Sequence, residues 1–371
     1  MNLKRYWFQP SEIAELSIKP TDGKDQRFIS QRAYQSLRPD MDNVSWNETF
    51  RNKLSNVQMF RANGIPSARF LGFLNNRDGS DAKGNPLTSG AELVELIRRE
   101  NVSEIALKHV VGGTGFGVWL LTIESGEKSG EMRLRDGRKV GVSWLDELIK
   151  GKERDINGYV VEEVVRPHVS INEVTGGGLF SVRLLSLRKR DGSVVIQGGM
   201  ARFGRVSGLT DHGPNGGLYS RINLNSGITE NAIQYRNGKP PIEHEGHPDT
   251  GRRLVGFSLP WFSEAISLTK RTHKVFPGVH FVGWDVLLGE DGPLMLEGNV
   301  GINVAFTQNV IGGFGDLGIL DEWKSELGCR LPDGSRSWRI SHYICGRRLT
   351  PFESFLASCC SRLSQSLRSS A

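Results

Sequence analysis

The spacing of hydrophobic residues along the chain switches between a helical period and a strand period, which predicts a mixed α+β fold. Apolar residues recur every three or four positions in four segments, so helices are expected at 48–63, 89–100, 142–150 and 260–275. Strands are expected at 68–73, at several places between 105 and 165, and over most of 166–310. Residues 1–44 are mixed and polar and are expected to be irregular or helical.

The most informative pattern is a β-hairpin expected over residues 282–299. Two apolar runs flank an Asp-Gly turn, and a turn centred near Asp291 places Asp285 across from Glu297, with Asn299 on the same face. Like charges that face each other destabilise a strand pair, so removing one acid is expected to keep or raise stability. Either a hard cation such as Mg²⁺ lies between these oxygens, or both acids face solvent.

A lysine and a glycine-rich loop precede the hairpin in the chain. Lys108 ends a short apolar run, and the loop that follows contains Gly113, Gly115 and Gly117. A lysine at a strand end and several backbone N–H groups can surround a polyphosphate. The loop is neither a Walker P-loop nor a dinucleotide fingerprint, because no Gly-Lys-Ser/Thr follows and Val118 stands where the third glycine belongs. A plain hairpin turn is the alternative interpretation.

Charged residues interrupt three further strand-like runs. Glu162 and Glu163 lie in an apolar run that continues through Val165, and such a strand can present backbone groups and an acid to an adenosine. Arg183 and Arg202 each lie inside an apolar run. An arginine that faces inward needs an anion, commonly a phosphate or a carboxylate. Alternatively, both arginines lie on exposed strand faces.

Taken in order, these residues resemble the ATP-grasp superfamily and, more narrowly, its sugar-transfer-associated branch. The resemblance extends from Asn47 to Val304. Short motifs carry it: Ser-Val-Arg-Leu-Leu-Ser-Leu at 181–187, Ala-Arg-Phe-Gly at 201–204, Asp-His-Gly-Pro-Asn-Gly-Gly-Leu at 211–218, His-Pro-Asp-Thr-Gly at 247–251, Gly-Trp-Asp at 283–285 and Leu-Glu-Gly-Asn at 296–299. One departure is His212, where an asparagine is expected after the aspartate.

The resemblance implies a role for each candidate residue. The implied contacts of ATP are Lys53, Lys108, Gly113, Gly115, Gly117 and the hinge residues Glu162, Glu163 and Val165. The implied ligands of Mg²⁺, or of Mn²⁺ in its place, are Asp285, Glu297 and Asn299. Arg183 would lie on the γ-phosphate or on an acyl-phosphate. The basic residues expected to hold the substrate carboxylate in line are Arg202, Arg205 and His212.

The same resemblance implies a fold that holds ATP between two α+β lobes. The implied segments are an N-terminal region at 1–100, a small lobe at 101–165, a large lobe at 166–320 and a helical extension at 321–371. The implied activity is ADP-forming ligation of a small-molecule carboxylate to an amine through an acyl-phosphate. Its substrates would be an amino acid, peptide or sugar acid in polysaccharide or secondary-metabolite biosynthesis. Alternatives for the same site are a small-molecule kinase and a nucleotide-binding module without catalysis.

Composition narrows the class of partner. The 371 residues include 47 basic and 41 acidic ones, and this mild net charge of +6, without a dense basic stripe, favours small anionic molecules as much as nucleic acid. Small-molecule substrates are expected, and no nucleic-acid partner. The start lacks the apolar core of a signal peptide and no run reaches membrane-spanning length, so a cytoplasmic location is expected. The four cysteines lack zinc spacing and are expected to be reduced. Apolar spacing over 352–367 predicts a helix that docks on the protein itself, with a membrane surface as the alternative.

Overall fold

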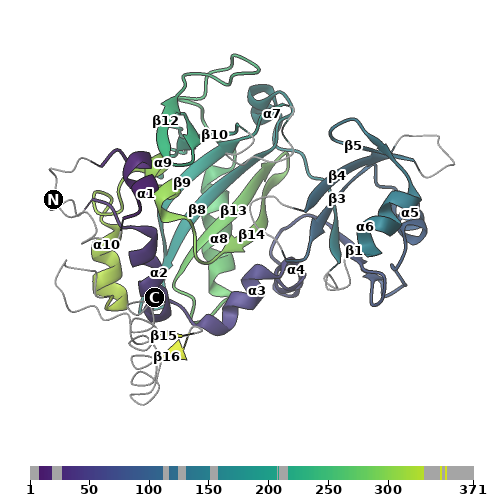
Figure 1. The fold of residues 1–371 in the computed structure, drawn as a ribbon, viewed down its shortest axis with the longest axis horizontal. Coiled ribbons are helices and arrows are strands. Elements are labelled where there is room, and N and C mark those ends of the chain that lie inside the picture. The colour runs from purple at the N-terminus through teal and green to yellow at the C-terminus, as the bar shows by residue number, and fades with distance from the viewer. Residues whose placement is uncertain are drawn as a thin grey trace, which may run out of the picture.

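The computed structural model describes residues 8–18, 27–111, 117–123, 131–150, 158–206, 208, 216–329, 343–344 and 347–348. Within these ranges the chain forms two lobes, each built on a seven-stranded sheet (Figure 1). The larger lobe lies on the left of Figure 1 and the smaller lobe on the right. Helices α3 (Asn47–Arg51) and α4 (Lys53–Ala62) lie between them. This arrangement confirms the α+β class.

The smaller lobe is an antiparallel sheet with helices on one face. Its strands are β1 (Phe70–Leu74), β2 (Ser80–Asp81), β3 (Glu104–His109), β4 (Val118–Ile123), β5 (Met132–Leu134), β6 (Lys139–Val140) and β7 (Tyr159–Glu163), in the order β2-β1-β7-β3-β4-β5-β6. Helices α5 (Gly90–Arg99) and α6 (Val142–Lys150) cover the face to which Ile105, Leu107 and Val161 point. Alternation therefore turns Lys108 and Glu162 to the other face.

The larger lobe has a second antiparallel sheet. Its strands are β8 (Phe180–Arg188), β9 (Val194–Phe203), β10 (Leu218–Arg221), β11 (Ile233–Arg236), β12 (Lys239–Glu243), β13 (Phe281–Gly289) and β14 (Gly292–Asn299), in the order β12-β11-β10-β9-β8-β13-β14. Helix α8 (Phe262–Lys274) packs on the face that carries Leu184 and Trp284. Helices α2 (Gln31–Met41), α9 (Val304–Ile311) and α10 (Ile319–Glu322) pack on the opposite face, beside Leu185 and Phe281.

A hydrogen-bond chain ties α8 to the centre of this sheet. The Trp284 indole donates to Ser186 Oγ at 2.9 Å, and Ser186 Oγ lies 2.6 Å from His273 Nδ1. His273 Nε2 lies 2.9 Å from the Val279 carbonyl. Burial lowers the pKa of His273 to about 4, because the imidazolium would lose its hydration here. The neutral ring with a proton on Nε2 satisfies every member of the chain.

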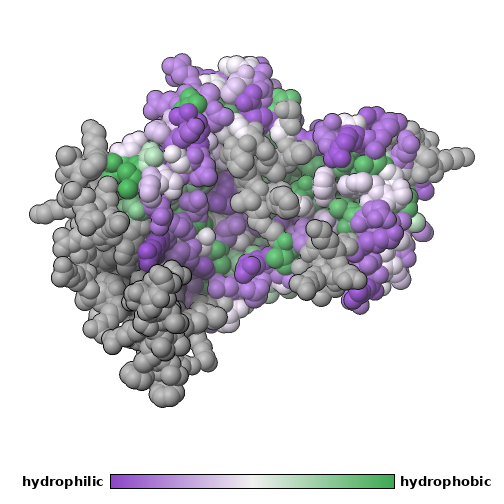
Figure 2. Space-filling view, viewed as in Figure 1, coloured by the Kyte–Doolittle hydropathy of each residue, from purple (hydrophilic) through white to green (hydrophobic). Residues whose placement is uncertain are grey.

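The remaining short elements lie at the lobe edges. They are α1 (Pro10–Glu15), the 3₁₀ turn Val44–Trp46, α7 (Val169–Thr175), the π-helical turn Trp323–Leu327, β15 (Tyr343–Ile344) and β16 (Arg347–Arg348). Among the coloured residues of Figure 2, most are hydrophilic, and hydrophobic residues form small groups on both lobes. In the described part of the chain, no helix is both long enough and apolar enough to cross a membrane.

Most predicted helices are confirmed, and two predictions need correction. Helices α5, α6 and α8 match the segments expected at 89–100, 142–150 and 260–275, and β1 matches the strand expected at 68–73. The single helix expected at 48–63 is wrong, because Asn52 is extended and separates α3 from α4. The expectation of one helix within 166–310 is also wrong, since α7 and α9 lie there.

The segment boundaries, the cysteines and the C-terminal helix are described only in part by the structure. Strands β1 and β2 share the smaller sheet, so that sheet reaches back across the boundary expected at residue 100, and the four-segment division stays a prediction. Cys329 is buried and forms no disulfide with another described residue. The other three cysteines and the helix expected over 352–367 lie outside the described residues.

Candidate active site

The β13–β14 hairpin has the register that its sequence predicts. Asp285 lies directly across from Glu297, and Gly289 pairs with Gly292 at the turn. A bulge after Asp285 shifts the register by one residue, so Val286 faces Met295. The prediction that the turn opposes two carboxylates is therefore confirmed.

Two arginines on neighbouring strands hold Asp285. Arg183 on β8 donates its Nε to Asp285 Oδ1 at 2.7 Å and its Nη2 to Oδ2 at 2.6 Å. Arg202 on β9 donates its Nη1 to Oδ2 at 3.2 Å. The side chains of Asp285 and Arg202 are almost fully buried, with 5% and 3% exposed. These guanidinium groups oppose the repulsion between Asp285 and Glu297, so they argue against the gain in stability expected on removing Asp285.

Asn299 lies beside both carboxylates. Its side-chain Nδ2 donates to Asp285 Oδ2 and to Glu297 Oε1, each at 3.3 Å. No group of three or more His, Cys, Asp or Glu side chains suited to a metal occurs within the described ranges. Two carboxylates and one amide nevertheless fit a hard divalent cation that completes its shell with water and phosphate. Asn299 would present its carbonyl oxygen after a turn of the amide.

Two lysines lie in the same space, Lys108 on β3 of the smaller lobe and Lys53 at the start of α4. Lys108 Nζ lies 2.5 Å from Glu162 Oε2, and Glu162 is buried. Burial disfavours the ammonium of Lys108, but the carboxylates of Glu162 and Glu297 outweigh it and raise its pKa. Burial lowers the pKa of Lys53 against the attraction of Glu297. Because Glu297 of the larger lobe acts on both lysines, the two lobes face each other here.

The start of α4 explains the position of Lys53. Asn52 caps the helix by accepting from the Ser55 N–H at 3.0 Å, and it forms a β-bridge with Val111 at the end of β3. The Lys53 N–H donates to the Val110 carbonyl at 2.9 Å. The break at Asn52 thus fastens the first turn of α4 to the strand that carries Lys108.

Of the three loop glycines, the structure describes one. Gly117 has φ +75°, and a Cβ there would lie 2.8 Å from His109 Cβ. Its carbonyl accepts from the His109 N–H at 2.8 Å, which closes the loop. Only glycine meets both conditions without strain. Gly113 and Gly115 lie outside the described residues, as does His212.

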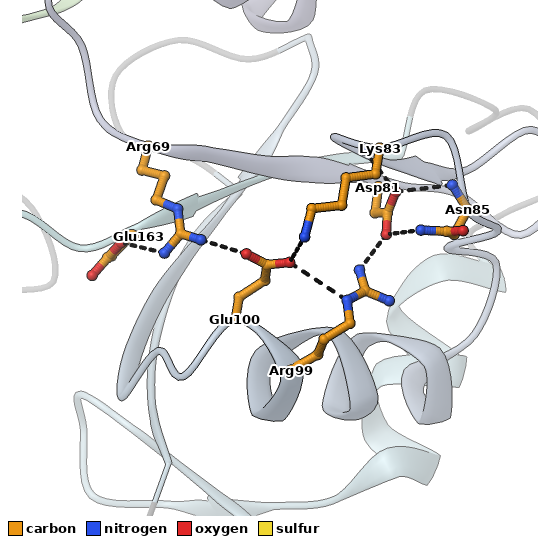
Figure 3. Close-up of polar contacts among 7 residues, drawn as sticks. All are labelled: Arg69, Asp81, Lys83, Asn85, Arg99, Glu100 and Glu163. Carbon is orange, nitrogen blue, oxygen red and sulfur yellow. Dashed lines mark hydrogen bonds and ion pairs between the residues drawn. The ribbon is translucent and has the colours of Figure 1, made fainter.

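The hinge strand directs its two acids to opposite sides. Glu163 lies 3.4 Å from Arg69, on the far side of β7 from the Lys108–Glu162 pair. Figure 3 shows Arg69 also contacting Glu100, which Lys83 and Arg99 approach from the other side. The side chain of Glu163 therefore does not point toward Lys53 and Lys108.

A cavity of about 810 Å³ lies between the end of β7, helix α8 and the turn of the β13–β14 hairpin. Its walls include Arg69, Glu163 and Val165 together with residues of α8. Lys108, Glu162 and Asp285 do not line it, so it is separate from the charged cluster. Val165 also packs against the α8 core, and its backbone contact with adenine stays a prediction.

Arg205 is held by an acid that the sequence-based assignment did not include. Its Nε donates to Asp249 Oδ2 at 2.8 Å, and its Nη2 contacts Oδ1 of the same carboxylate. This pairing lowers the pKa of Asp249 to about 2. Asp249 lies in the His-Pro-Asp-Thr-Gly motif at 247–251, and this motif was the sequence feature that could have indicated its role. A role for Arg205 in substrate binding stays a prediction.

The charges that meet between the lobes are almost balanced. Among the described residues, this charged cluster consists of four cations, Lys53, Lys108, Arg183 and Arg202, and three anions, Glu162, Asp285 and Glu297. All seven side chains are buried or half-buried, and Arg183 is only 12% exposed. Such a cluster can neutralise and orient a polyphosphate, because buried cations act strongly in a low-dielectric site.

Comparison with protein families identifies the group to which the chain is related. The model of the family described as sugar-transfer associated ATP-grasp matches residues 33–315. The chain belongs to this family. The matched range contains every strand of both seven-stranded sheets. The ATP-grasp fold expected from the sequence is therefore confirmed.

Solved structures with similarity to this ATP-grasp chain are distant. N5-carboxyaminoimidazole synthase from Aspergillus clavatus is 13% identical, with a TM-score of 0.36, over 73% of this chain and 50% of that one. D-alanyl-alanine synthetase A from Vibrio cholerae is 12% identical, with a TM-score of 0.42, over 76% and 66%. Biotin carboxylase from Campylobacter jejuni is 12% identical, with a TM-score of 0.41, over 73% and 47%. The chain thus spans about half the length of the first of these, and none of the curated proteins compared matches it.

Proposed function

We propose that this protein is an ATP- and Mg²⁺-dependent ligase that joins a small-molecule carboxylate to an amine or similar nucleophile and releases ADP and phosphate. The observation that carries the proposal is the meeting of Lys53 and Lys108 from one side with Arg183 and the Asp285–Glu297–Asn299 set from the other. Membership of the ATP-grasp family supports ATP as the nucleotide.

The proposed reaction proceeds in two steps. A substrate carboxylate oxygen attacks the γ-phosphorus of ATP, the bond to the β,γ-bridging oxygen breaks, and an acyl-phosphate and ADP form. The amine nitrogen then attacks the acyl carbon, phosphate leaves, and the nitrogen gives up a proton. A divalent cation, when bound, neutralises charge on the transferred group. No protein nucleophile is required.

Each side chain in the cluster has a positioning task in this proposal. Lys53 and Lys108 hold the polyphosphate, and Glu162 keeps Lys108 charged and in place. Arg183 and Arg202 stabilise the negative charge that develops as the phosphoryl group is transferred. Asp285, Glu297 and Asn299 would hold the cation. Arg205 and His212 are proposed to bind the substrate carboxylate.

The setting of the reaction is also proposed. Surface-polysaccharide or secondary-metabolite biosynthesis in the cytoplasm agrees with the description of the family, and an amino acid, peptide or sugar acid would be the carboxylate. The cluster of seven charged side chains supports small anionic molecules as the substrates.

The test is a product analysis with purified protein, MgATP and paired sets of carboxylates and amines. We expect ADP, phosphate and an amide, identified by chromatography and mass spectrometry, and we expect Glu297→Gln to abolish all three. AMP and pyrophosphate as products would contradict the acyl-phosphate route. A phosphorylated alcohol without an amide would show a kinase instead.

A further inference from the structure

Donors of the protein itself fill the acceptor sites of one oxygen of Asp285, Oδ2. Oδ1 accepts from Arg183 Nε, while Oδ2 accepts from Arg183 Nη2, Arg202 Nη1 and Asn299 Nδ2. Each carboxylate oxygen has two lone pairs, so the three donors at Oδ2 fill its acceptor sites, whereas Oδ1 accepts from one of these donors. A cation that binds Oδ2 takes one of these two lone pairs, so at least one of the two guanidinium groups must leave this oxygen.

The displaced donor needs another anion. A guanidinium does not lose its charge at any pH at which proteins fold, so Arg183 and Arg202 cannot leave Asp285 by deprotonation. Both side chains are nearly buried, with 12% and 3% exposed, so moving either one away unpaired is costly. A phosphate group accepts the same two-pronged hydrogen bonds as a carboxylate. Nucleotide phosphates are the alternative partner that the cluster can take.

The charge balance also favours binding of the cation together with the nucleotide rather than alone. Lys53, Lys108, Arg183 and Arg202 already outnumber the three carboxylates of the cluster by one. A divalent cation alone would add to this excess and be repelled. A nucleotide triphosphate brings more negative charge than the cation brings positive charge, so together they are accommodated.

We propose that Arg183 and Arg202 compete with divalent cations for Asp285, and that a nucleotide triphosphate relieves this competition by drawing the guanidinium groups onto its phosphate oxygens. The inference rests on the proposed function, which places ATP and a cation here. The two arginines have opposite effects on the affinities for the two ligands. They weaken the binding of the cation alone and strengthen the binding of the nucleotide alone.

The experiment measures each ligand separately. Binding of Mn²⁺ is followed by the loss of the free-ion signal in electron paramagnetic resonance, and binding of a non-hydrolysable ATP analogue is followed by calorimetry in EDTA. For Arg183→Gln and Arg202→Gln we expect Mn²⁺ affinity without nucleotide to rise roughly tenfold and analogue affinity without metal to fall roughly tenfold. Arg221→Gln is the matched control, because Arg221 pairs with Glu230 on the same sheet. It should change neither value.

The outcomes separate this inference from the function on which it rests. Arginine variants that weaken both ligands, or leave Mn²⁺ affinity unchanged, would overturn the competition. Wild-type protein that binds Mn²⁺ equally well with and without the analogue would overturn it as well, while the ligase proposal stands. Wild-type protein that binds neither ligand would refute both. Arg202 is the more buried of the two, so Arg183→Gln decides the test if Arg202→Gln does not fold.

Discussion

Replacing Asp285 by asparagine is expected to destabilise the protein in the absence of any ligand. The change removes the charge that faces two guanidinium groups, of which Arg202 is 3% exposed and Arg183 12%. Removing one partner from a buried pair costs about 3 kcal/mol at the low end of the measured range. The low end applies because the asparagine carbonyl can still accept one hydrogen bond and Arg183 is partly reached by water.

The assay is urea unfolding in EDTA without nucleotide, followed by tryptophan fluorescence, since Trp284 is buried beside Asp285. The matched control is Asp249→Asn, which breaks the pair with Arg205. That pair is more exposed, with 31% and 23% of its side chains accessible, so its loss should cost about 1 kcal/mol. The expected difference between the two variants is therefore about 2 kcal/mol. An Asp285→Asn protein as stable as wild type, or more stable, would show that repulsion from Glu297 outweighs the arginines.

Three further predictions concern stability and nucleotide binding. The pKa of His273 lies at about 4 because of burial, so folding stability should fall by about 3 kcal/mol as the pH drops from about 6.5 to about 4. Urea unfolding over this range should show that slope in wild type and not in His273→Gln. Gly117→Ala should cost about 2 kcal/mol in the same assay, through its left-handed backbone and the approach to His109, and a neutral effect would contradict the loop geometry. Lys108→Met should lower ATP affinity at least about tenfold by calorimetry, whereas unchanged affinity would remove Lys108 from the phosphate site.

The hairpin and several helices could be predicted because their signals are local. The Asp-Gly turn and the period of two fix the pairing of Asp285 with Glu297. Helix α5 begins where Ser89 and Glu92 form a capping box, which is a sequence signal within four residues. Such patterns depend on residues close together in the chain, so they can be recognised without knowledge of the tertiary contacts.

The partners of the site could not be predicted because they come from distant parts of the chain. Arg183 and Arg202 lie 102 and 83 residues before Asp285, and nothing in their local runs names that carboxylate as their anion. The break at Asn52 depends on a bridge to Val111, and α9 is only eight residues long, which is too short for a strong helical period in the sequence. These features are decided by tertiary contacts, which override local preference.

The two ends of the smaller lobe meet, and this has a consequence for how the chain is assembled. The Glu163 N–H donates to the Arg69 carbonyl at 3.0 Å, so the segment 69–163 leaves and rejoins the rest of the chain at one point. Its core, around Leu93, Leu107 and Leu145, is separate from the core against α8. Topologically the segment is an insertion, like a guest domain within a host. A short linker could bridge the same gap, so Lys108 and its sheet form a unit that recombination can exchange without cutting through the host's core.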